Sequence, residues 1–376
     1  SLGADASVVP ADLSWDGPRT LVLAFFAPEL ALRPASLELL RTAFPQSYLL
    51  GCSTAGEIVG TSLEDHSVAV AVVNFASTDL CMARTQIANA AFSRDAGTDL
   101  GRSLSRPDLK GVFVLSDGLN INGTELAKGL NETLPPHVSV TGGLAGDGER
   151  FGTTYTFAAG PGEPLNTNSG QVGAVGFYGD AIRISFSSKG GWSPFGLERK
   201  VTRSVGNVLY ELDGKPALEL YKTYLGDRAQ GLPATALLFP LAICDEQTFG
   251  PDALVRTILA VDENAQSLIF AGDIPQGAVV QLMRCSLDRL VEGAANAAEN
   301  LGDQGKGPAL SIAITCVGRR LVLGERAEEE LEAVLESLPA ETQQVGFYSY
   351  GELSPVAVGQ CHLHNQTMTL TLVQED

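Results

Sequence analysis

The segment YLLGCSTAGE (Tyr48–Glu57) sets the pattern on which the fold depends: an apolar run that ends in a glycine-rich turn and a carboxylate. A short apolar run with such punctuation is typical of a buried strand. A second apolar run, TLVLAFF (Thr20–Phe26), precedes it, and between the two runs Leu37, Leu40 and Phe44 recur at helical spacing. The strand-like run SVAVAVVNF follows the turn. This first block therefore predicts strand, helix, strand, glycine turn with an acid, strand.

Two later segments repeat the same order. In the second block GVFVLSD is followed by a helical pattern, by VSVTGGLAGDG (Val138–Gly148) and by GAVGFYG; in the third, ALSIAITCVG is followed by a helical pattern, by VGFYSYGE (Val345–Glu352) and by TMTLTLV. A repeated block indicates a repeated structural unit. We predict an α/β fold of the mixed α+β kind, in which strand-helix-strand-strand blocks form mixed sheets in two associated domains.

Glycine, proline and charged residues interrupt the apolar periodicity near TYLGDRAQGLP (Thr223–Pro233). We place the division slightly before this stretch. The expected organisation is an N-terminal segment at 1–18, an N-terminal domain at 19–213 and a C-terminal domain at 214–376.

Charge and composition narrow the class of function. The chain of 376 residues has a formal net charge of −19, which repels phosphate backbones and anionic lipids, so we expect no nucleic acid and no membrane as partners. No apolar run approaches the ~20 residues that cross a bilayer. The six cysteines are scattered without a C-x-x-C pair, and the sequence begins without a secretory leader. These features predict a cytoplasmic protein with reduced cysteines.

The glycine-acid turns are the main candidate for a binding site. Glycine lets the backbone turn tightly and present N–H groups, while a carboxylate at the rim would hold an amine. The alternative is that each acid caps a neighbouring backbone. Trp192, in the loop GGWSPFG, would be either an aromatic lid or a hydrophobic plug. The predicted ligand-binding residues are Cys52, Ser53, Thr54, Gly56, Glu57, Gly142, Gly143, Asp147, Trp192, Tyr350 and Glu352.

Two other chemistries have weaker candidates. Cys52 or Ser53 would serve as the nucleophile of a hydrolase, but no histidine base accompanies them in the sequence. His362 and His364, in CHLHN, are the only clustered metal-ligand types, and no third ligand is identifiable. We therefore name no catalytic residue and no metal site, and keep these two histidines as candidates for haem or metal.

Several phrases together resemble the FIST family, a bacterial sensory module named for F-box and intracellular signal transduction. GCSTAGEI, FVLSDG, GGLAGDG, GAVGFYGD and GGWSPFG resemble its FIST N domain, and LVRTILAVDENAQSLIFAGDIPQG, VGRRLVLGER, GFYSYGELSP and LHNQTMTLTL resemble FIST C. The resemblance covers about Arg19 to Val373.

This resemblance implies a sensor of small ligands, with amino acids proposed for many members. It implies a signalling partner such as a histidine kinase, a chemoreceptor or a cyclic-dinucleotide enzyme. One branch is associated with haem and nitric oxide, so a haem-dependent gas sensor is an alternative. Because no kinase, methyl-accepting or cyclase segment follows Val373, we expect a stand-alone sensor acting through a separate protein. The family supplies no catalytic residues, and we expect no enzyme.

Overall fold

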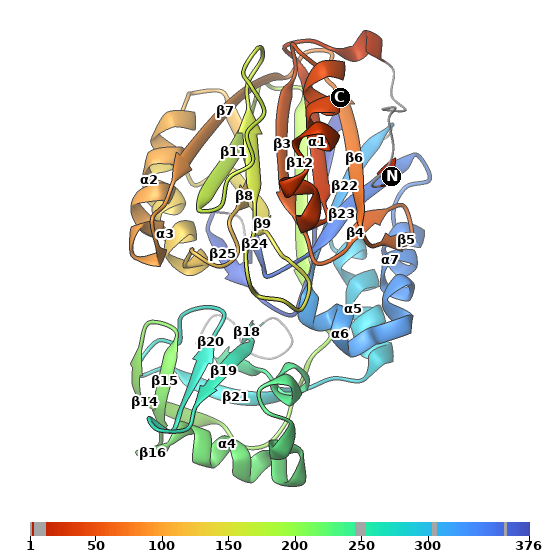
Figure 1. Ribbon diagram of the computed structural model, residues 1–376. Coiled ribbons are helices and arrows are strands. Elements are labelled where there is room, and N and C mark those ends of the chain that lie inside the picture. Colours follow the sequence, from red (N-terminus) through yellow and green to blue (C-terminus); the bar gives the residue numbers. More distant parts are fainter. Residues whose placement is uncertain (1, 4–12, 245–252, 303–306, 357–358) are drawn as a thin grey trace.

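The computed structural model describes residues 2–3, 13–244, 253–302, 307–356 and 359–376. Three mixed β-sheets with helices around them form one part of the molecule, and a fourth sheet with one helix forms another (Figure 1). We call the first part the body and the second, residues 193–284, the small domain. Residues 1 and 4–12 of the predicted N-terminal segment lie outside the described residues.

Each sheet of the body is built around one of the three sequence blocks. The first strand of a block pairs in parallel with the second and antiparallel with the last. These strands are β2 (Thr20–Phe26), β3 (Tyr48–Ser53) and β6 (Ser67–Asn74); β8 (Leu109–Ser116), β9 (Ser139–Leu144) and β11 (Gln171–Tyr178); and β22 (Ala309–Cys316), β23 (Thr342–Ser349) and β26 (Met368–Glu375). The predicted mixed α+β fold of repeated blocks is confirmed.

Beyond each glycine turn the chain leaves its own sheet and joins another. Strand β4 (Glu57–Val59) pairs with β23, β24 (Gly351–Pro355) pairs with β9, and β10 (Thr156–Ala159) pairs with β3. The exchange is cyclic, since each of the three blocks gives one strand and receives one. No block completes its sheet without another, and the three turns are drawn to a common centre.

The outer strands extend the same pattern. The last strand of the first block leads to β7, which pairs with β11, and β11 leads to β12, which pairs with β26. The remaining strands of the body lie at sheet edges. These outer strands are β1 (Leu2–Gly3), β5 (Ser62–Glu64), β7 (Asp79–Gln86), β12 (Ile182–Lys189) and β25 (Cys361–His364).

Helices lie around the outside of the body, while the inner faces of the three sheets pack together (Figure 1). The helices are α1 (Pro34–Ala43), α2 (Ser93–Leu104), α3 (Gly123–Thr133), α5 (Leu287–Glu299), α6 (Val317–Leu323) and α7 (Ala327–Glu336). Along β2, Phe25 points to the centre and stacks on Phe347 at 4.7 Å between ring centroids, and Phe26 packs in the cluster that contains α1 residues Leu37 and Leu40. All seven residues of β2 are buried because both faces of its sheet are covered. No described helix is long and apolar enough to cross a membrane.

The small domain is inserted between β12 and α5. It contains β13 (Ser193–Pro194), β14 (Arg199–Val205), β15 (Val208–Leu212), β16 (Lys215–Pro216), α4 (Ala217–Leu225), β17 (Leu241–Cys244), β18 (Leu254–Arg256), β19 (Ile258–Asp262), β20 (Ser267–Phe270) and β21 (Val279–Arg284). Its own apolar core packs α4 against the sheet. The boundary predicted at Asp213 lies in the turn between β15 and β16, so segments from both sides of it build this domain.

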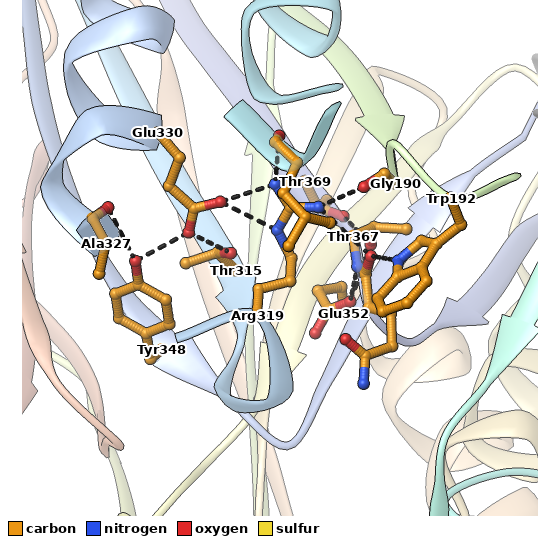
Figure 2. Close-up of polar contacts among 12 residues, drawn as sticks. Gly190, Trp192, Thr315, Arg319, Ala327, Glu330, Tyr348, Glu352, Thr367 and Thr369 are labelled. Carbon is orange, nitrogen blue, oxygen red and sulfur yellow. Dashed lines mark hydrogen bonds and ion pairs between the residues drawn. The ribbon is translucent and has the colours of Figure 1, made fainter. Parts of the chain in front are cut away.

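A buried ion pair holds the two connections to the small domain (Figure 2). Arg319 on α6 pairs with Glu330 on α7 at 2.6 Å, and both side chains are fully buried. Arg319 also donates to the carbonyl oxygen of Gly190 on the outgoing connection and, at 2.8 Å, to that of Leu290 on the returning helix. The Tyr348 hydroxyl donates to the remaining oxygen of Glu330. The pair therefore fixes where the small domain leaves and re-enters the body.

Removing the charge of Glu330 should destabilise the whole protein. Glu330→Gln leaves the Arg319 guanidinium buried without a counter-ion, and such a loss costs about 3–5 kcal/mol. Urea unfolding measures the free energy of unfolding. The matched control is Glu329→Gln, whose half-exposed carboxylate pairs with Arg326 and should cost less than about 1 kcal/mol. Equal costs for the two variants would contradict this account of the ion pair.

Candidate functional site

The three glycine turns predicted as the binding site meet at the centre of the body. Between the first and second turns, the Gly146 amide donates to Ser53 O at 2.9 Å. Between the first and third, the Ala55 amide donates to Tyr348 O at 2.8 Å. Between the second and third, the Tyr350 amide donates to Leu144 O at 3.2 Å. The backbone groups that would have faced a ligand are thus largely engaged with one another.

Two of the turn carboxylates occupy equivalent positions and have equivalent partners. Glu57 is 1% exposed and accepts hydrogen bonds from the Thr54 hydroxyl and, at 3.1 Å, from both the amide and the hydroxyl of Ser67. Glu352 is fully buried and accepts from the Ser349 hydroxyl at 2.8 Å and from the amide and hydroxyl of Thr367. Glu57 therefore ties its turn to the first residue of β6, and Glu352 ties its turn to the residue directly before β26.

Asp147 in the second turn is also buried, but its partners differ. One carboxylate oxygen accepts from the amides of Gly152 and Thr153 at 2.8 and 2.9 Å. The other accepts from the hydroxyl of Tyr350, so the second and third turns are linked by side chains as well. The ring of Tyr350 stacks on Phe151 at 4.7 Å between centroids. These contacts correspond to the capping alternative raised from the sequence.

The predicted site glycines lie where backbones approach closely. A Cβ on Gly142, whose φ is +148°, would stand 1.9 Å from the carbonyl oxygen of Val114 in the neighbouring strand. A Cβ on Gly143 would stand 2.9 Å from Ile314, across the contact between two sheets. Gly56 has φ of +134°, and a Cβ there would meet the Arg320 guanidinium. Close contact between strands and sheets accounts for Gly142 and Gly143, and the positive φ together with the Arg320 side chain accounts for Gly56.

Cys52 and Ser53 lie inside the first sheet. Burial raises the pKa of the Cys52 thiol well above its usual value, which disfavours the nucleophilic thiolate. The Ser53 hydroxyl donates to Gly146 O at 2.8 Å and accepts from the Tyr155 amide at 2.9 Å. Both groups therefore serve as packing and hydrogen-bonding elements of the centre.

Trp192 and the two clustered histidines lie beside the third turn, where His364 on β25 pairs with Glu352 on β24. The Trp192 ring is buried, and its indole N–H donates to Gln366 O at 2.8 Å, so it fills the junction with the small domain (Figure 2). His364 is buried with Nε2 3.0 Å from Ser354 O, and burial lowers its pKa to about 3. That nitrogen is engaged, which does not fit an axial haem ligand. In the described part of the chain, no three histidines, cysteines or acids gather to hold a metal.

His362 lines an open cavity of about 360 Å³ that we call the seam cavity, because the body and the small domain both contribute to it. Helix α3, the segment 360–363 at β25, and Arg256 at the end of β18 form its walls. Its lining residues are Thr124, Ala127, Lys128, Asn131, Glu132, Arg256, Gln360, Cys361, His362 and Leu363.

The seam beside this cavity is held by polar contacts between the two parts. The Asp273 carboxylate accepts from the Asn122 side-chain amide at 2.8 Å and lies 3.9 Å from the Lys128 ammonium. Arg256 donates at 2.9 Å to the carbonyl oxygen of Leu363 on β25. Asn131 pairs with both the carbonyl and the amide of Cys361 at 2.9 Å, so α3 and β25 are joined as well.

The sequence interpretation missed Arg256 and Lys128. Arg256 lies within LVRTILAV, where one arginine interrupts an apolar strand, and this signal was available. Lys128 gives no such signal, because a lysine on an amphipathic helix usually faces solvent. The acid of FAGDIPQG, Asp273, follows a strand like the other glycine-acid turns but lies at the seam, apart from the three central turns.

The model of the FIST N domain matches residues 20–215, and that of the FIST C domain matches residues 217–355. An uncharacterized protein of Methanocaldococcus jannaschii is 25% identical over 218 residues, which cover 50% of this chain and 41% of the relative. The matched region is thus about two fifths of that relative's length.

The two central glutamates should make stability depend on pH. Burial raises the pKa of Glu57 to about 7 and that of Glu352 to about 8. The folded state holds these two protons more tightly than the unfolded chain does. The two glutamates therefore contribute fully to the free energy of unfolding below about pH 4.5, and this contribution is lost as the pH rises through 7 and 8. The free energy of unfolding should fall across this range, by at most about 1.4 kcal/mol per pH unit for each group. Glu352→Gln should flatten the slope.

Urea unfolding between pH 5 and 8.5 measures this slope for the wild type, for Glu57→Gln and for Glu352→Gln. Glu341→Gln, an exposed acid, is the matched control and should leave the slope unchanged. Identical slopes in the wild type and both variants would show that the central glutamates do not titrate in this way.

Proposed function

We propose that this chain, which belongs to the FIST family and contains both its N and C domains, is an intracellular sensor of an amino acid or a similar metabolite. FIST domains are sensory domains of signal transduction. The observation that carries the proposal for this chain is the seam cavity. Its volume of about 360 Å³ is within the range of about 300–1,000 Å³ that is usual for small-molecule sites, and its position between two parts is a common one for ligands.

Charges of both signs in the lining favour a ligand with two charged ends. Lys128 and Glu132 lie four residues apart on α3, hence on one face of that helix, and Arg256 faces them from the small domain. An amino acid carries a carboxylate and an ammonium group within a few ångströms. The three central turns are the binding site predicted from the sequence. Their carboxylates are buried and already hydrogen-bonded within the protein, so the seam cavity is the better candidate for an amino-acid site.

The output of the sensor is proposed from the family. A cytoplasmic signalling protein, such as a histidine kinase, a chemoreceptor or a cyclic-dinucleotide enzyme, would read the liganded state through contact. The chain itself is proposed to perform no catalysis. The placement of Cys52 and Ser53 inside a sheet agrees with that proposal, because neither is presented to a substrate.

A thermal-shift screen of the wild-type protein tests the proposed function. Each of the twenty L-amino acids is added in turn, with sodium chloride at equal ionic strength as the control. A true ligand at a hundred times its dissociation constant should stabilise the folded state by about 2.7 kcal/mol, which raises the unfolding midpoint by a few degrees. If no amino acid raises the midpoint above the salt control, an amino-acid sensor is the wrong assignment.

A further inference from the structure

Two arginines of the described residues are buried, and they differ in one respect. Arg319 is 0% exposed and has a carboxylate partner, Glu330, at 2.6 Å. Arg256 is 3% exposed, and its hydrogen-bond acceptors are backbone carbonyl oxygens: Leu363 at 2.9 Å, Asp273 at 3.2 Å and Val255 at 3.3 Å. Among the described residues, no carboxylate lies within salt-bridge distance of the Arg256 guanidinium. Within the described part of the chain, Arg256 is therefore a buried cation that forms no ion pair, and the carboxylate that acts on it through space is Asp273.

A buried charge without a counter-ion is costly, because carbonyl dipoles replace only part of its hydration. Burial lowers the pKa of Arg256 only to about 10, so the guanidinium stays charged at neutral pH. The Asp273 carboxylate favours the charged form of Arg256 through space, but its hydrogen bond is with Asn122 and its ammonium neighbour is Lys128 at 3.9 Å. The free-energy cost of burying the Arg256 charge therefore falls at a residue that lines an open cavity.

Lys128, on α3, supplies a second cation to the same cavity. Its side chain is 49% exposed, and the ammonium group lies 2.6 Å from Glu125 and 3.9 Å from Asp273. Glu132, the acid in the lining, is engaged by Arg94. The lining thus contains two cations and one acid, and both Lys128 and Glu132 have ion-pair partners outside it, in a chain whose net charge is −19. Since the overall field repels anions, an anion site needs such local cations.

We infer that the seam cavity binds a small organic carboxylate, with Arg256 at its buried end and Lys128 at its exposed side as the anion-binding residues. This inference rests on the proposed sensor function and specifies its site and the chemical group that is recognised. The ligand carboxylate would form an ion pair with Arg256, as Glu330 does with Arg319. Guanidinium is suited to this role because its N–H groups match a carboxylate in a fork.

The position of the two cations couples binding to the seam. Arg256 belongs to the small domain and Lys128 to the body, so one carboxylate held by both would bridge the two parts. It would also compete with Glu125 and Asp273 for Lys128. Ligand binding would thereby change which contacts hold the small domain against α3, and a partner could recognise that change.

The experiment compares variants by isothermal titration with each amino acid that shifts the wild-type midpoint. Lys128→Gln should weaken binding about 10- to 100-fold, which corresponds to the loss of one charge-assisted hydrogen bond. Arg256→Lys keeps the charge but loses the fork, and should weaken binding to a similar degree. Lys222→Gln is the matched control: Lys222 is a partly exposed lysine of α4 that pairs with Glu263 away from the cavity, and its loss should leave affinity unchanged.

The ligand is varied as well. The α-carboxamide of the same amino acid lacks the negative charge and should bind at least about tenfold more weakly to the wild type, but with little further loss in Lys128→Gln. Binding that is unaffected by both cavity variants would overturn the site and leave the sensor function standing. Equal affinity for inorganic phosphate would overturn the carboxylate assignment. If Arg256→Lys does not fold, Lys128→Gln alone tests the carboxylate site, because the Lys128 side chain is half-exposed and its replacement should not disturb folding.

Discussion

The cost of taking a charged group out of water is the constraint on which both the fold and the proposed site depend. Inside the body, every buried acid described at the three turns has hydroxyl or amide partners, and Arg319 has Glu330. These pairings place turns, strands and the two domain connections in fixed positions. Arg256 is the exception, since its hydrogen-bond acceptors among the described residues are carbonyl groups and Asp273 acts on its charge only through space. The exception lies at the seam between the two parts, where a ligand can reach it.

The cyclic exchange of strands explains why the glycine turns are packed so tightly. Each turn must carry its chain from one sheet to the next within a few residues, and a side chain on Gly142 would collide with the neighbouring backbone. The buried glutamates then anchor the turns to Ser67 and Thr367, at the start of the last strands. A site built from such turns has little freedom to admit a ligand. The seam, where the small domain meets the body, has an open cavity instead.

Much of the fold was predictable from the sequence, because apolar periodicity and repeated turns are local signals. The strands Thr20–Phe26 and Tyr48–Ser53 and the helix that contains Leu37 and Leu40 were all expected. The sequence also indicated that Glu57 and Glu352 end equivalent turns. It did not show that these turns pass into neighbouring sheets, since strand pairing between distant blocks leaves no local pattern. For the same reason Lys128 and Arg256, 128 residues apart in the chain, were not recognised as neighbours of one cavity.

A crystal structure of the protein grown with an amino acid that stabilises it would test the central claim most directly. The account predicts density for the ligand in the seam cavity, with its carboxylate within hydrogen-bond distance of the Arg256 guanidinium and the Lys128 ammonium group. Density at the central turns, beside Glu57, Asp147 or Glu352, would contradict it. So would a ligand in the seam cavity whose carboxylate points away from Arg256.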